Sequence, residues 1–73
     1  MINLREVRIA AGMSQNDIAV ALGMSKNGQR TVSQIEARAD WLLSSLSAYI
    51  KAAGGTAELV VKVSGEEIRF IVA

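Results

Sequence analysis

Several polar side chains lie close together in the segment 29–34, which reads QRTVSQ. Arginine can form a forked pair of hydrogen bonds with guanine, glutamine can do so with adenine, and a threonine methyl group can contact thymine. Such contacts require the side chains to project from the outer face of a helix. Val32 and Ile35, three residues apart, supply an apolar inner face. On charge alone, an ordinary solvated surface is the favoured interpretation of Arg30 and the nearby Lys26.

Other kinds of chemistry have few residues to work with. The 73-residue chain has no cysteine and no histidine, which removes the usual soft metal ligands, the common general base and any disulfide. A nucleophile and its base would have to be assembled from scattered serine and aspartate residues. We therefore expect no enzyme, no metal site and no cofactor.

Composition favours a small folded domain of the cytoplasm. Hydrophobic residues make up 51% of the chain, which is too many for a disordered segment. No apolar run approaches the roughly 20 residues of a membrane span, and the amino end lacks the layout of a signal peptide. We expect a cytoplasmic protein without a membrane partner. Residues 1–38 carry five basic and three acidic side chains, whereas residues 39–73 carry three and four, so the front half is the basic half.

The elements that must position the polar segment change character at Gly54-Gly55. Before this pair, apolar residues recur at helical spacing, whereas after it they alternate. Ser14 and Asp17 form a variant of the capping box, and Gly12 and Gly23 can end the helices that precede them. The pattern predicts four short helices, at about 3–11, 15–22, 29–37 and 42–53.

The alternating residues 56–73 predict a β-hairpin with its turn at Ser64-Gly65-Glu66. A lone two-stranded hairpin is marginal in water and leaves an edge unpaired. Two copies that meet edge to edge would form a four-stranded sheet, so we expect a homodimer. The expected interface is apolar and consists of Val61, Val63, Ile68, Phe70 and Val72. The alternative is a hairpin folded back on its own helices in a monomer.

The predicted fold class is therefore α+β. A helical unit at 1–53 is followed by the hairpin at 56–73, and together they form one compact domain.

The helical half resembles a known family. The segments LREVRIAAGMSQNDIAVALGMS (4–25) and VSQIE (32–36) are similar to the lambda-repressor/Cro-like, or Xre-type, helix-turn-helix proteins. The similarity covers about 50 of the 73 residues. It is carried by Leu4, Arg8, Gly12, Ser14-Gln15, Ala19, Gly23 and VSQIE. It implies a four-helix DNA-binding unit in which Ala19 is small because the two motif helices cross closely there.

The resemblance also assigns roles within the motif. The helix from about 29 to 37 would lie in the major groove of double-stranded DNA. Its base contacts would come from Gln29, Arg30, Thr31 and Gln34. Phosphate contacts would come from Gln15, Lys26, Ser33 and Arg38. Because phosphate would repel Glu36, we expect Glu36 and Arg8 to pair with each other or with neighbours inside the domain.

The chain departs from the family spacing between the two motif helices. Val32 comes nine residues after Gly23, where the family pattern has six, so about three residues are inserted. We interpret the insertion as a longer turn, because the pair Asn27-Gly28 tolerates positive φ. The other interpretation is a helix that starts at Ser25 and contains Gly28, at a cost of about 1 kcal/mol relative to alanine.

The segment LLSSLSAYIKAAGGTAELVVKV (42–63) further resembles the end of small Xre-type antitoxins of the HigA kind. This resemblance implies a sequence-specific repressor that binds a palindromic operator as a homodimer and controls its own promoter. Neutralisation of a partner toxin would be a second role. Phage repressors and the autorepressors that accompany anti-CRISPR genes are equally compatible. An alternative of another class is a protein-interaction adaptor without DNA binding, which the inserted turn favours.

Overall fold

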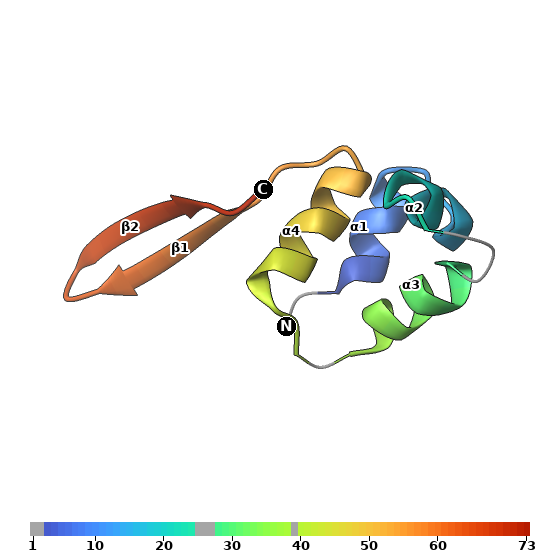
Figure 1. The fold of residues 1–73 in the computed structure, drawn as a ribbon. Coiled ribbons are helices and arrows are strands. Elements are labelled where there is room, and N and C mark those ends of the chain that lie inside the picture. Colours follow the sequence, from blue (N-terminus) through green and yellow to red (C-terminus); the bar gives the residue numbers. More distant parts are fainter. Residues whose placement is uncertain (1–2, 25–27, 39) are drawn as a thin grey trace.

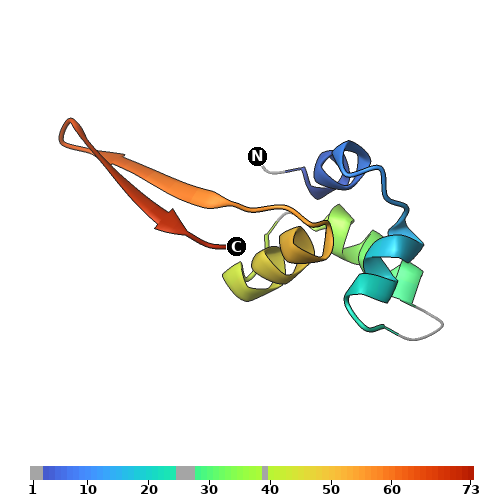
Figure 2. The ribbon, with the colours of Figure 1, turned by 90° about the horizontal axis from the view of Figure 1, so that it is seen from above.

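The chain consists of four helices and a β-hairpin in a computed structural model, which describes residues 3–24, 28–38 and 40–73. The helices are α1 (Leu4–Ala10), α2 (Gln15–Ala21), α3 (Gly28–Ala37) and α4 (Leu43–Ala52). The strands β1 (Glu58–Val63) and β2 (Glu66–Ile71) pair antiparallel. The helices cluster together and the hairpin projects away from them (Figures 1 and 2). The predicted fold class is confirmed. None of the described helices is long and apolar enough to cross a membrane.

Local signals place the helix ends close to where the sequence predicts them. The Ser14 hydroxyl accepts a hydrogen bond from the Asp17 backbone N–H at 3.0 Å, and the Asp17 carboxylate accepts one from the Ser14 N–H at 2.8 Å. The bond from the Ser14 backbone N–H lowers the pKa of Asp17, because the charged carboxylate accepts it. Gly12 and Gly23 both have positive φ, at 69° and 75°, directly after the C-cap residues of α1 and α2. The predicted capping box and helix ends are thus confirmed.

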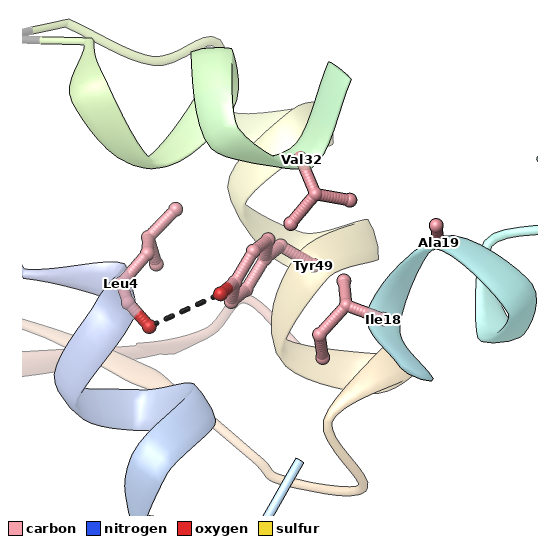
Figure 3. Packing of buried hydrophobic residues seen from close by; sticks show 5 residues of the cluster. All are labelled: Leu4, Ile18, Ala19, Val32 and Tyr49. Atoms are coloured by element: carbon pink, nitrogen blue, oxygen red, sulfur yellow. Dashed lines mark hydrogen bonds between the residues drawn. The ribbon is translucent and has the colours of Figure 1, made fainter. Parts of the chain in front are cut away.

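The core lies entirely among the four helices. Leu4, Ile18, Ala19, Val32 and Tyr49 come one or two from each helix and are at most 2% exposed (Figure 3). Partly buried Met13, Met24, Ile35 and Trp41 pack around this cluster. The hairpin strands contribute no buried residue. Burial therefore stabilises the helical unit, whereas the hairpin needs stabilising contacts outside this core.

The crossing of α2 and α3 explains a glycine that the sequence assigns to a turn. Gly28 is the first residue of α3 and is not among the glycines with positive φ, so its predicted role as a left-handed turn residue is wrong. A Cβ atom on Gly28 would lie 2.7 Å from the Met24 Cβ and 2.8 Å from the Ala19 Cβ. Close contact between the helices requires the glycine. The prediction that Ala19 is small for the same reason is confirmed, while the predicted turn at 25–27 lies outside the described residues.

The hairpin has the predicted strand faces and a tighter turn. Leu59 pairs with Phe70 and Val61 pairs with Ile68, as the alternation requires. The turn consists of Ser64 and Gly65 alone, with φ of 50° and 79°, which is the combination that a two-residue type I′ turn needs. The turn is one residue shorter than predicted, because Glu66 belongs to β2.

We predict that Gly28→Ala destabilises the protein, although alanine is the better helix former. The added methyl group must push Met24 or Ala19 aside, and such overpacking lowers the free energy of unfolding by about 1 to 3 kcal/mol. Urea unfolding followed by circular dichroism measures this change. Gln29→Ala, at the next and exposed position, is the matched control and should change stability by less than about 0.5 kcal/mol. Equal stability of the two variants would refute the close crossing.

Candidate nucleic-acid interface

The exposed side of α3 gathers the polar side chains predicted to contact bases. Gln29, Arg30, Thr31 and Gln34 are all exposed, whereas Val32 on the same helix is fully buried. Arg30 and Gln34 are four residues apart, so they lie one above the other on the outer face. Thr31 lies on one flank of this face and Gln29 on the other, since each residue advances the helix by about 100°. The helix thus presents a continuous strip of hydrogen-bonding groups to solvent.

Beside this strip, residues of α1, α2 and α3 line an open polar hollow of about 350 Å³. It brings together Gln15 and Ser33, two of the predicted phosphate contacts. Arg5 lines the same hollow and is exposed, although the sequence pattern assigns it no role. Its position one turn before Arg8 on the first helix is a signal that could have identified it. The full lining consists of Asn3, Arg5, Arg8, Gln15, Ser33, Glu36 and Ala37.

The Glu36 carboxylate at the back of this hollow joins α3 to the other three helices. Arg8 of α1 donates from Nε to Oε2 at 2.8 Å and from Nη2 to Oε1 at 3.3 Å. Gln15 of α2 donates from Nε2 to Oε1 at 3.3 Å. The Tyr49 hydroxyl of α4 donates to Oε2 at 2.6 Å. The same hydroxyl also lies 3.2 Å from the Leu4 carbonyl oxygen, as Figure 3 shows. We call Glu36 and its three donors, Arg8, Gln15 and Tyr49, the Glu36 cluster. The predicted pairing of Glu36 with Arg8 is confirmed.

Burial and charge act in opposite directions on the Glu36 cluster. The Arg8 and Glu36 side chains are only 13% and 7% exposed. Burial by itself would raise the pKa of Glu36, but the hydrogen bonds from Arg8, Tyr49 and Gln15 outweigh it and the pKa is lowered. Burial and the bond to Glu36 together raise the pKa of Tyr49, which therefore stays a neutral donor. The cluster contains one anion and one cation, and every buried side-chain polar atom in the described residues has a partner.

The remaining predicted phosphate contacts are less closely grouped. Arg38 is exposed and follows directly after α3, but it is not among the residues that line the hollow. Lys26 lies outside the described residues. One N–H of the Gln15 side-chain amide donates to Glu36, which leaves its second N–H and its carbonyl oxygen for other partners.

The end of α3 is held by a residue outside the proposed contacts. Trp41 Nε1 donates to the Ile35 carbonyl oxygen at 2.8 Å, so Trp41 fixes the end of α3 in addition to packing against the core.

A solved structure of a HigA antitoxin is 30% identical to this chain, with a TM-score of 0.78 and coverage of 96% of this chain and 93% of that one. The chain belongs to the HigA-like family of helix-turn-helix proteins. That HigA antitoxin is described as bending DNA through a unique dimerization. Coverage of 96% extends the HigA-like similarity beyond the helices into the hairpin. No protein-family model matches the chain, and no curated protein sequence matches it either.

We predict that Glu36→Gln lowers the free energy of unfolding at pH 7 by about 3 kcal/mol. Removing one partner of a nearly buried ion pair leaves the other charge uncompensated. The exposed pair Arg69–Glu58, at 3.0 Å with side chains 61% and 52% exposed, is the control. Arg69→Ala should cost less than about 1 kcal/mol. Equal losses in the two variants would contradict the central role of the Glu36 cluster.

Comparison of Glu36→Gln with the natural chain gives a pH test. The folded-state pKa of Glu36 lies below the ordinary value of 4.5, so the folded protein binds fewer protons than the unfolded chain as acid is added. The stability that Glu36 supplies is present above pH 4.5 and is lost as the pH falls through the folded-state pKa. Urea unfolding between pH 3 and pH 6 should therefore show a smaller pH dependence for Glu36→Gln than for the natural chain. Parallel curves would contradict the lowered pKa.

Proposed function

We propose that the protein is a homodimeric, sequence-specific double-stranded DNA-binding repressor that acts on its own promoter. The observation that carries this proposal is the outer face of α3, where Arg30 and Gln34 are exposed on a helix that the Glu36 cluster ties to the other three helices. A rigid helix fixes the directions of its side chains, which base recognition needs. The HigA-like family and the DNA bending described for the related antitoxin support the same conclusion.

In this proposal α3 enters the major groove with its amino-terminal half nearest the bases. Arg30 forms the forked pair with guanine, and Gln34, one turn further on, reads an adjacent base. Gln29 and Thr31 on the two flanks contact neighbouring positions. These contacts set the sequence preference.

Phosphate contacts hold α3 in register. The polar hollow fits one phosphate group, since Arg5 supplies a positive charge while Gln15 and Ser33 supply neutral donors. Glu36 in the same hollow is compensated by Arg8, so it does not cancel the charge of Arg5. Arg38 contacts a second phosphate beyond the end of α3.

The hairpin forms the dimer that a palindromic operator requires. Two copies related by a two-fold axis present two α3 helices to two half-sites. Val61, Val63, Ile68 and Phe70 of the predicted interface are between 36% and 52% exposed in the single chain. Val72 is partly buried, at the base of the hairpin. Several half-exposed apolar side chains gathered on one hairpin of a small domain favour a protein partner.

Antitoxin activity is a second candidate function, favoured by the likeness to a HigA antitoxin along nearly the whole of both chains. Co-expression with the product of the adjacent gene tests it. A stable complex in which that product loses its toxicity would support the role. A gene neighbourhood without a toxin, or a toxin that the chain does not bind, would leave DNA-binding repression alone. If the chain is instead a protein-interaction adaptor, its affinity for promoter DNA should be as low as its affinity for random DNA.

We predict that Arg30→Ala and Arg5→Ala weaken DNA binding in different ways. Arg30→Ala should cost about 1 to 3 kcal/mol on promoter DNA and little on random DNA, because a base contact is lost. Arg5→Ala should weaken binding to both and lower the salt dependence, since each phosphate contact contributes roughly 0.9 to the slope of log affinity against log salt concentration. Fluorescence anisotropy on both DNAs at several salt concentrations separates the two roles. Equal losses on both DNAs for Arg30→Ala would make Arg30 a phosphate contact.

We predict that Phe70→Glu makes the protein largely monomeric. The new charge would lie on the apolar face of the hairpin, and promoter affinity should fall by roughly 10²- to 10⁴-fold because two linked half-sites become one. Ile71→Glu is the matched control, since Ile71 is 84% exposed on the opposite face of the same strand. Sedimentation and anisotropy measure the two effects. A dimeric Phe70→Glu protein, or a monomeric Ile71→Glu protein, would contradict the proposed interface.

A further inference from the structure

The two faces of the hairpin differ in a way that edge pairing does not explain. One face carries Leu59, Val61, Val63, Ile68 and Phe70, with exposed fractions of 36% to 52%, and ends at the tip with Glu66, which pairs with Val63. The other face carries the ion pairs of Lys62 with Glu67 and of Arg69 with Glu58 and Glu67, together with Val60 and Ile71. Edge-to-edge pairing would satisfy the backbone of the outer strand but leave the whole apolar face in water. The face, rather than the edge, therefore needs a partner.

The apolar face continues into a groove at the base of the hairpin. Val7 of α1 and Leu43, Leu46 and Ile50 of α4 line this groove, together with Leu59 of the hairpin itself. Its volume is about 270 Å³ and its lining is mostly apolar. Leu43 is 57% exposed. The tip of the same hairpin cannot fill the groove, because it points away from the helices (Figures 1 and 2).

The size of the hairpin shows that its face alone is too small for a stable dimer. Each strand has six residues, so the face is about 20 Å long and about 10 Å wide. Stable interfaces bury roughly 800 Å² of accessible surface on each partner, which exceeds what such a face offers even with its side-chain relief. The groove adds apolar area that is continuous with the face.

We infer that the occupant of the groove is the hairpin tip of a second copy of this chain. The two hairpins pack face to face and antiparallel about a two-fold axis near the pair Val61–Ile68, which is the middle pair of the apolar face. The tip of each hairpin, with Val63, then lies over the base of the other and covers Leu43. The charged faces remain in water on both outer sides.

This inference rests on the dimer of the proposed function, but it specifies a packing arrangement that can fail while DNA binding by a dimer holds. It also predicts contacts between α4 and the partner's hairpin, which edge-to-edge pairing does not.

The natural absence of cysteine allows a direct test in the full chain without DNA. The double variant Leu43→Cys/Val63→Cys is treated with a short bifunctional maleimide at a concentration where sedimentation shows a dimer. The matched control is Leu43→Cys/Lys62→Cys, which moves the second thiol to the charged face one residue away. Circular dichroism checks that both variants fold. We expect a covalent dimer from the first variant and at least tenfold less from the control.

A second measurement does not depend on cysteines. Leu43→Glu should weaken dimerisation at least tenfold in sedimentation, while Ser44→Glu at the neighbouring exposed position should not. Equal crosslinking of the two cysteine variants, or an unchanged dimer in Leu43→Glu, would overturn the inference in favour of edge pairing. A chain that sediments as a monomer would overturn it too, and would assign the groove to another protein. Loss of DNA binding with crosslinking intact would refute only the proposed function.

Discussion

The position of α3 depends on the carboxylate of Glu36. This one side chain accepts hydrogen bonds from Arg8, Gln15 and Tyr49, and thus from each of the other three helices. A small apolar core can hold helices together without fixing their rotation, because apolar contacts have little directionality. Charge-assisted bonds between 2.6 and 3.3 Å do fix it. The orientation of Arg30 and Gln34 toward a nucleic acid follows from that constraint.

The chain divides its physical tasks between two parts. The helical unit encloses the buried cluster and can hold its shape, whereas the hairpin strands expose apolar side chains along their whole length. A 73-residue chain has little surface to bury within itself, so association is an economical source of further stability. In this account, association of the hairpins also sets the distance between two α3 helices. The same contacts then serve stability and recognition.

Much of the fold could be predicted from local patterns. The capping pair Ser14 and Asp17, the glycines after α1 and α2, and the alternation in the hairpin each act over a few residues, and each is confirmed. Gly28 could not be assigned from its neighbours, because its role depends on how closely Ala19 approaches across the helix crossing. Local propensity suggested a turn where tertiary packing required a small residue.

The candidate site was predictable in part. The exposed residues of α3 follow from helical spacing around Val32, and the pairing of Glu36 with Arg8 followed from their charges. The contributions of Tyr49 and Gln15 to the Glu36 cluster could not be predicted. These residues are 13 and 21 positions from Glu36 in the sequence and contact it only in the folded chain. The same holds for the hollow that brings Arg5 to Ser33. The assigned DNA contacts themselves remain predictions.

A footprint of the intact protein on its own promoter tests the central claim most directly. Hydroxyl-radical cleavage at increasing protein concentration reports which sugars are protected and at what spacing. A dimer that reads a palindrome with two α3 helices should protect two symmetric patches, centred one helical turn of about 10 base pairs apart or a whole multiple of it. The patches should appear together at nanomolar protein. Protection of a single patch, or uniform protection only at micromolar protein, would contradict the account.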